Sequence, residues 1–200
     1  MSRRTNSARS SPTSRSGEAR GLDPRSDEAA GYPDRTTLAG PEATAEQISA
    51  LASRAEVVHF AGHARLGGEP ALLLGSDREM RASDIARMHL SGSRLVVLAA
   101  CGTAAGGGNG FDGPHGLVQA FLTAGAGAVV GTLWPVDDAE TAALFTEFHR
   151  RLRDGEDAAE ALRHSQLSVL HGGNQRWRQP AAWAAAELFG GNIRIGGSND

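Results

Sequence analysis

The sequence has a single cysteine, Cys101, and no lysine among its 200 residues. One cysteine cannot form an internal disulfide bond, and it could supply a zinc site with one thiolate at most. Without lysine there is no phosphate-binding loop of the Gly-Lys-Ser/Thr type. A cysteine-dependent phosphatase would need arginine six residues after Cys101, where Gly107 stands. These absences exclude two common classes of phosphate chemistry.

Long apolar runs are also absent. No stretch approaches the roughly 18 apolar residues of a membrane-spanning helix, and the N-terminus has no apolar segment of the kind that secretion signals carry. The 23 acidic and 20 basic residues leave a formal net charge of −3. This is too little charge of either sign to favour binding to nucleic acid or to an anionic membrane. We therefore expect a soluble, cytoplasmic protein.

Residues 1–35 contain hardly any large apolar side chains and are rich in Ser, Arg, Gly, Pro and acidic residues. Such a segment cannot offset the entropy that is lost on ordering, so it is predicted to be a disordered tail. The remaining residues suffice for one hydrophobic core. We expect a single domain over residues 36–194 and a short disordered C-terminus over residues 195–200.

Beyond the tail, short apolar runs alternate with helical patterns. Strands are predicted at residues 56–60, 94–100 and 128–133, with a short edge strand at residues 72–74. Helices are predicted at residues 44–53, 83–88 and 113–124, then from Asp137 and Asp138 to Leu152, and after Gly155 up to residue 170. Residues 180–191 fit either a helix or an edge strand. The alternation predicts an α/β fold, with a mostly parallel sheet and helices on both faces.

Several helix boundaries have local signals. Thr44, followed three residues later by Gln47, predicts the start of the first helix. Ser83 or Asp84 is the expected cap of the second helix. Gly125 is the expected C-terminal stop of the third helix.

The candidate catalytic residues lie at the carboxyl ends of two predicted strands. His63 follows the strand at residues 56–60, and Cys101 follows the strand at residues 94–100. In an open parallel sheet, neighbouring strands deliver such residues to one crevice. A thiol with an ordinary pKa of about 8.5 is only a few per cent ionised at neutral pH, so a nucleophilic cysteine needs a nearby imidazole to take its proton. The pattern indicates a Cys-His pair.

Simpler explanations exist for each of these residues. A lone cysteine is often an inert buried thiol, although the glycine-rich loop that follows Cys101 favours close approach to a substrate. His59 lies inside a predicted strand and is expected to be a core histidine. His115 lies close to Cys101 in sequence and stays a candidate. The remaining histidines are expected to be solvated on helix surfaces or loops, and they are His89, His149, His164 and His171.

Two segments, HFAGHA at residues 59–64 and VVLAACGT at residues 96–103, resemble the catalytic motifs of the CHAT family, which belongs to the caspase-like clan of cysteine peptidases together with separase. The segment GLVQAFLTAGAGAVVGTLWPVDD at residues 116–138 is similar to the helix, strand and Trp-Pro turn of that family. The similarity extends over about residues 38–191. It implies a caspase-hemoglobinase-like three-layer α/β sandwich.

The resemblance also implies residue roles. It implies that His63 is the general base, that Cys101 is the nucleophile of a cysteine endopeptidase, and that backbone amides at Ala64 and Cys101 form the oxyanion hole. Asp112 and Asp138 are candidates for a pocket that binds a basic substrate side chain, although both also fit ordinary helix caps. No metal or cofactor is implied. The expected partners are a protein substrate and a regulatory or tetratricopeptide-repeat protein.

The chain departs from the family pattern at two points. Ala64 stands where the family usually has glycine, and a positive φ at this position would strain an alanine. Fewer strands and helices precede His63 than in other members, so the domain looks truncated on its N-terminal side. An exposed sheet edge would invite pairing with another chain, including a second copy.

The sequence also contains signals for three other functions. Gly108, Gly110 and Gly113 fit the GxGxxG pattern of dinucleotide-binding proteins, but several residues separate this pattern from its strand. A zinc site from His59, His63, Cys101 and His115 has no standard spacing. The serious alternative is a catalytically inactive or partner-dependent CHAT module that acts in interaction or regulation.

Overall fold

The computed structural model describes residues 31–32, 34–76, 78–100, 116–135 and 138–196. In this part of the chain the strands are β1 (Val57–Arg65), β2 (Ala71–Leu73), β3 (Glu79–Arg81), β4 (Leu95–Ala100), β5 (Ala128–Thr132) and β6 (Ala186–Gly190). The helices are η2 (Gly40–Glu42), α1 (Ala45–Ala52), α2 (Ala82–Ile85), α3 (Gly116–Thr123), α4 (Asp138–Arg153), α5 (Ala158–His171), η3 (Gln175–Arg178) and α6 (Pro180–Trp183).

The strands form one six-stranded sheet in the order β3-β2-β1-β4-β5-β6. The central strands β1, β4 and β5 run parallel to one another. β2 and β3 continue the sheet on one side in antiparallel pairings, and β6 pairs antiparallel with β5 on the other side. The predicted parallel centre is confirmed, and the antiparallel flanks make the sheet mixed.

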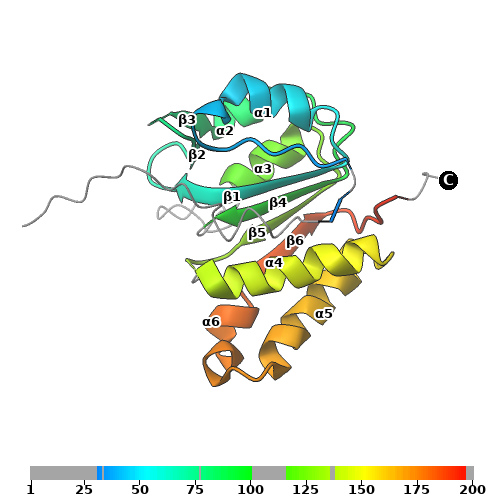
Figure 1. The fold of residues 1–200 in the computed structure, drawn as a ribbon. Coiled ribbons are helices and arrows are strands. Elements are labelled where there is room, and N and C mark those ends of the chain that lie inside the picture. The colour runs from blue at the N-terminus through cyan, green and yellow to red at the C-terminus, as the bar shows by residue number, and fades with distance from the viewer. Residues whose placement is uncertain (1–30, 33, 77, 101–115, 136–137, 197–200) are drawn as a thin grey trace, which may run out of the picture.

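Helices cover both faces of the sheet, which confirms the predicted α/β fold. Figure 1 shows α1, α2 and α3 on one side of the strands and α4, α5 and α6 on the other. Every residue of β4 and of β5 is buried. A parallel strand that is covered on both faces is expected to be apolar throughout, and for this reason both strands could be predicted from their sequence.

Alternation along the strands divides the apolar side chains between two cores. The α1–α3 core contains Val96, Leu98 and Val129 from the sheet, packed with Ile85, Leu117 and Phe121 from the helices. The α4–α6 core contains Leu95, Val97 and Val130 from the sheet, packed with Phe145, Phe148 and Leu152 from α4. Successive strand residues point to opposite faces, so adjacent residues of β4 serve different cores.

Several helix ends lie where local sequence signals occur. Thr44 is the N-cap of α1, and its Oγ1 accepts a hydrogen bond of 3.2 Å from the backbone N–H of Gln47. Gly125 ends α3 with a φ of +103°, a conformation that glycine adopts without strain. Asp157 caps α5 by accepting a hydrogen bond from the Glu160 N–H. Each of these signals acts within one helical turn of its helix end.

Other boundaries differ from the predictions. α2 ends at Ile85 rather than Met88, and Arg81 is its N-cap, without a side-chain hydrogen bond. Instead of a cap, Glu69 from the β1–β2 loop accepts the N–H of Ser83 at 3.0 Å. β2 is not an edge strand, because the unpredicted strand β3 pairs with it. The ambiguous segment at residues 180–191 forms both of the structures considered, the short helix α6 followed by the edge strand β6.

Candidate active site at the carboxyl edge of the sheet

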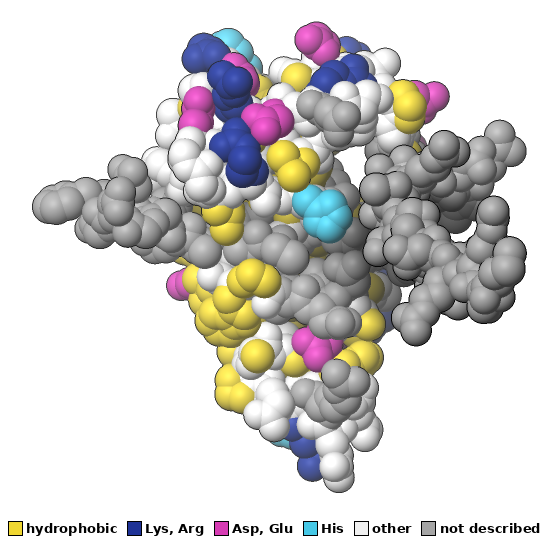
Figure 2. Space-filling view, turned by 90° about the vertical axis from the view of Figure 1, so that its left-hand side faces the viewer, with side chains coloured by type: hydrophobic (Ala, Val, Ile, Leu, Met, Phe, Trp, Pro, Cys, Tyr) yellow, Lys and Arg dark blue, Asp and Glu magenta, His cyan; other side chains and the backbone are white. Residues whose placement is uncertain are grey.

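Backbone register brings the ends of β1 and β4 together. Gly62 of β1 pairs with Ala100 of β4 in the last paired position of these parallel strands. His63 is the residue after Gly62, and Cys101 is the residue after Ala100, although Cys101 itself lies outside the described residues. Figure 2 looks onto this edge of the sheet, where charged side chains gather in the upper part and hydrophobic side chains in the lower part.

His63 lies in a strand and not in the loop that the sequence predicted. β1 continues five residues beyond Phe60, because its residues up to Gly62 pair with β4 and those from His63 to Arg65 pair with β2. The side chain of His63 is exposed to solvent. Its partner in the register is Leu73, an exposed large hydrophobic residue with 39% of its surface accessible. A substrate could therefore approach the imidazole without displacing other parts of the described chain.

Arg65 holds the segment that follows His63. Its Nε and Nη2 donate to the two carboxylate oxygens of Glu79 at 3.1 and 2.7 Å, and its Nη1 donates to the carbonyls of Gly67 and Glu69 at 2.7 and 2.9 Å. A two-pronged arginine-carboxylate contact fixes both side chains in one orientation. The β1–β2 loop is thereby tied to β3.

Ala64 adopts a strand conformation. It pairs with Leu72 in the antiparallel register and packs against the α1–α3 core. Among the described residues, Ser76 is the one non-glycine residue with a positive φ, at +62°. Alanine at position 64 is therefore not strained, and glycine is not required there by the backbone conformation.

The end of β5 is joined to β4 and to α6. The Thr132 hydroxyl donates to the Ala100 carbonyl at 2.6 Å. The next two residues bond to the segment around α6: the Leu133 N–H donates to the Ala185 carbonyl at 2.8 Å, and Trp134 Nε1 donates to the Ala181 carbonyl at 2.9 Å. These bonds hold α6 beside the carboxyl edge of the sheet.

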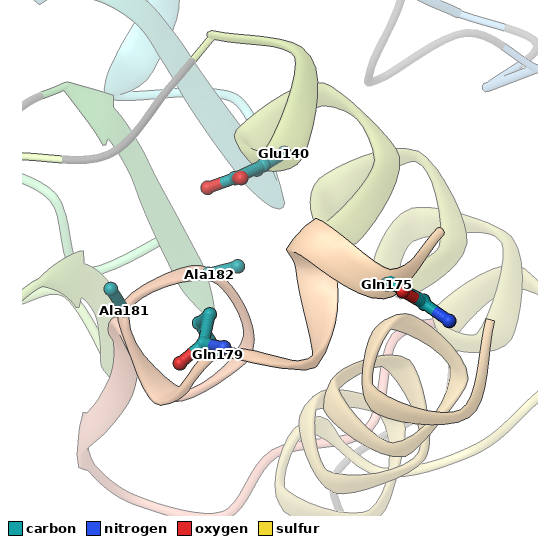
Figure 3. Close-up of a pocket in the computed structure, with 5 residues that line it drawn as sticks. All are labelled: Glu140, Gln175, Gln179, Ala181 and Ala182. Atoms are coloured by element: carbon teal, nitrogen blue, oxygen red, sulfur yellow. The ribbon is translucent and has the colours of Figure 1, made fainter. Parts of the chain in front are cut away.

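A pocket of about 460 Å³ opens beside α6. It is lined by Glu140 of α4, Gln175 of η3, Gln179, Ala181 and Ala182. Figure 3 shows the Glu140 carboxylate and the Gln179 carboxamide on either side of Ala182. No motif links these residues in the sequence, so the prediction did not include Glu140. Of the predicted pocket residues, Asp112 lies outside the described residues, and Asp138 begins α4 with its side chain not described.

The prediction that His149 is solvated is wrong. His149 lies on the inward face of α4 and is fully buried, with 0% of its surface accessible. Its Nδ1 lies 3.1 Å from the Tyr32 hydroxyl, and its Nε2 lies 2.9 Å from Nδ1 of His59. Desolvation by burial is the main cause that holds the pKa of His149 well below its ordinary value, and the nearby His59 and Arg153 add to this effect. His59, expected to be a core histidine, is half-buried, and its Nδ1 lies at hydrogen-bond distance from His149.

Tyr32 fastens the N-terminal segment to this face. The Arg153 guanidinium lies 5.5 Å from the centre of the Tyr32 ring, a cation-π distance. Burial raises the pKa of Tyr32 to about 12, and Arg153 partly opposes this shift. Tyr32 falls within residues 1–35, of which the structure describes 31, 32, 34 and 35.

The other described histidines are accessible. His89 and His171 are exposed, and His164 is half-buried with its Nδ1 2.8 Å from the Glu156 carboxylate. Within the described ranges, no group of three or more His, Cys, Asp or Glu residues could hold a metal ion. His115 and the residues of the GxGxxG pattern lie outside those ranges. No helix in the described part of the chain has the length and apolar character to cross a membrane.

Together, the mixed sheet with a parallel centre and the helices on both faces form a caspase-hemoglobinase-like α/β sandwich. The family profile of the CHAT domain matches residues 13–191, and the chain belongs to this family. The match begins within residues 1–35, the segment predicted to be a tail.

Curated relatives carry this region within much longer proteins. Tetratricopeptide repeat protein 28 of Mus musculus is 28% identical over 199 aligned residues, which cover 79% of this chain and 8% of that protein. The Homo sapiens protein of the same name is 32% identical over 84 residues, covering 42% of this chain and 3% of its own length. The chain thus spans less than a tenth of the length of these relatives.

Proposed function

We propose that the protein is a cysteine endopeptidase that hydrolyses peptide bonds of a protein substrate through His63 and Cys101. The observation that carries the proposal is the parallel register between β1 and β4, in which Gly62 pairs with Ala100. The residues that follow these two are the proposed base and nucleophile. Membership of the CHAT family and the exposure of His63 support the same function.

In the proposed reaction, an imidazole nitrogen of His63 takes the proton of the Cys101 thiol, and the thiolate attacks the carbonyl carbon of the peptide bond. The tetrahedral intermediate collapses, the C–N bond breaks, and His63 gives its proton to the leaving amine. Water then gives a proton to His63 and attacks the thioester. The C–S bond breaks, the carboxylate product leaves, and Cys101 regains its proton.

The charge that develops on the carbonyl oxygen needs hydrogen-bond donors. We assign this role to the backbone amides of Ala64 and Cys101. Such donors, aimed at an oxyanion, commonly contribute on the order of 100-fold to turnover. The strand conformation of Ala64 supports the assignment, because a backbone held by pairing to β2 is fixed before the substrate binds. We also propose that the carboxylates of Asp112 and Asp138 lie near the substrate and bind a basic side chain.

Labelling with a peptidyl acyloxymethyl ketone tests the proposal. We expect mass spectrometry to find the adduct on Cys101, and the rate to fall by roughly 100-fold or more in His63→Ala, because the thiol loses its base. The matched control is His171→Ala, since His171 is an exposed histidine at the end of α5 and belongs to no strand of the sheet. Labelling that is equally fast in His63→Ala and in the wild-type protein would contradict the proposal.

The second candidate is an inactive interaction or regulatory module. The observation in its favour is that both matched relatives bear the name tetratricopeptide repeat protein and that the chain corresponds to a small part of each. For such a module, the electrophile is expected to react with Cys101 no faster than with a free thiol peptide, whether or not His63 is present.

A further inference from the structure

Leu73 exposes a large apolar side chain beside the proposed general base. It is the register partner of His63 in the antiparallel pair of β1 and β2, and 39% of its surface is accessible. Residues that lie directly opposite each other in an antiparallel pair project to the same face of the sheet, with their Cβ atoms roughly 5 Å apart. The Leu73 side chain is therefore a direct neighbour of the His63 imidazole.

The face that carries both side chains is opposite the α1–α3 core. Ala64, Leu72 and Met80 pack in that core, so the residues that alternate with them point the other way. The α4–α6 core covers this other face at the centre of the sheet, but it takes none of the described residues of β2 or β3. A single exposed leucine is common at protein surfaces. The position of Leu73, opposite the proposed base, is what makes it informative.

The charged group opposite Leu73 on this face is already paired. Glu79 of β3 is the register partner of Leu73, and its two carboxylate oxygens accept hydrogen bonds from the Arg65 guanidinium. These hydrogen bonds hold the pKa of the Glu79 carboxyl below its ordinary value, so Glu79 is ionised at neutral pH and matched in charge by Arg65. The contact that Leu73 itself offers to a substrate is apolar.

The order of the strands decides which part of a substrate meets Leu73. The order β2-β1-β4 places His63 between Leu73 and the end of β4, which Cys101 follows. In the proposed reaction the acyl part of the substrate stays on Cys101, and the amine that receives the proton of His63 must come within about 3 Å of the imidazole. This amine belongs to the residue directly after the cut bond. Leu73 borders His63 on the side away from Cys101, where the side chain of that residue can reach it.

We propose that Leu73 contacts the substrate residue directly after the cut bond and favours a large apolar side chain there. The proposal rests on the peptidase function and adds a substrate class to it. The contact removes apolar surface of both partners from water. It also positions the residue whose nitrogen takes the proton of His63. Leu73 is a substrate-binding residue in this assignment and takes no part in the bond-breaking steps.

The first experiment varies the leaving group of the acyloxymethyl ketone and keeps its peptide. When the Cys101 thiolate displaces the carboxylate from the methylene carbon, a C–S bond forms, the C–O bond breaks, and the carboxylate departs on the side of the leaving amine. Acetate and 4-methylpentanoate have nearly the same acidity, and they differ in the leucine-like chain of the second. We expect the 4-methylpentanoate probe to label Cys101 roughly 5-fold faster, which is less than the roughly 10-fold or more of an enclosed pocket, because Leu73 offers contact from one side.

Each variant is judged by the ratio of its two labelling rates, which does not depend on its overall reactivity. Leu73→Gln is expected to make the two rates equal, and Leu73→Met, which keeps an apolar chain, is expected to preserve the ratio. Leu51→Gln is the matched control, since Leu51 is a similarly exposed leucine, at 37%, on α1 at the other side of the sheet (Figure 1). Equal rates of the two probes in the wild-type protein, or a ratio that Leu73→Gln leaves unchanged, overturn the proposal.

The second experiment reads the preference from cleavage itself. A library of peptides with blocked amines is incubated with the wild-type protein or with His63→Ala, and mass spectrometry identifies the residue at each new N-terminus. We expect leucine, methionine and phenylalanine to be enriched there over serine and aspartate, and Leu73→Gln to remove the enrichment. Labelling and cleavage that depend on His63 but show no apolar preference leave the peptidase intact and overturn the role of Leu73. If neither depends on His63, the peptidase fails, and the role of Leu73 fails with it.

Discussion

At the scale of single residues, His149 shows how position decides the behaviour of an ionisable group. The same residue type is exposed at His171 and fully buried at His149. Burial holds the pKa of His149 well below its ordinary value, so the imidazole is neutral in the folded protein at neutral pH. In the unfolded chain it titrates near pH 6.5. Because the unfolded state then binds the proton more readily, acid weakens the fold.

We expect the free energy of unfolding to fall as the pH drops below about 6.5, by up to about 1.4 kcal/mol per pH unit from this residue, down to the pKa of the folded protein. Above that range its contribution is constant. Urea unfolding between pH 5 and 8 measures the slope. His149→Gln is expected to lose this part of the slope, while His171→Gln keeps it. An unchanged slope in His149→Gln would show that another group is responsible.

At the scale of elements, α3 and α4 end with the same pattern of backbone hydrogen bonds. At the end of α3, the N–H groups of Gly125 and Ala126 donate to the carbonyls of Leu122 and Phe121. At the end of α4, the N–H of Gly155 donates to the Leu152 carbonyl in the same way. Gly125 has a φ of +103° and Gly155 a φ of +93°. Both ends use the left-handed conformation that is typical of helix C-termini.

Alanine at either glycine is expected to destabilise the fold by about 1–2 kcal/mol, because a side chain is strained at positive φ. Gly125→Ala should cost more than Gly155→Ala. A Cβ at position 125 would lie 3.3 Å from the backbone nitrogen of Ser91, whereas a Cβ at position 155 meets nothing within 4 Å. Chemical denaturation of both variants measures the difference. Equal losses would mean that the contact with Ser91 relaxes freely.

At the scale of the whole molecule, one sheet joins two cores that share no helix. Phe121 is 2% exposed in the α1–α3 core, and Phe145 is fully buried in the α4–α6 core. Trp177 and Trp183 pack against the α4–α6 core, and Trp134 bonds to α6. The fluorescence of all three tryptophans therefore reports on the α4–α6 side of the sheet.

We expect the two cores to unfold together, since every residue of β4 and β5 is buried between them. Phe121→Leu and Phe145→Leu should each cost about 1–2 kcal/mol, and their effects should add in the double variant because the sites lie on opposite faces. Tryptophan fluorescence and far-ultraviolet circular dichroism should give one midpoint in urea for each variant. A fluorescence midpoint in Phe121→Leu that lies above the circular dichroism midpoint would indicate separate unfolding.

Predictions from the sequence succeeded where the cause was local. β4 and β5 are continuous apolar runs, and strands buried on both faces need such runs. Thr44 and Gly125 act on the backbone within one turn of the helix. The predictions failed where the partner was distant: β1 continues through His63 because β2 pairs with it, and β3 is three residues long with two exposed positions, so it has no signal of its own.

The alternation of strands and helices, the two buried central strands and the family follow from side-chain periodicity and motifs, so they could be predicted from the sequence. The burial of His149, its contacts with Tyr32 and His59, and the pocket that Glu140 and Gln179 both line became visible in the folded structure. Burial and long-range hydrogen bonds depend on which faces of the elements meet. That choice is made by the packing of the whole chain, and a local pattern does not contain it.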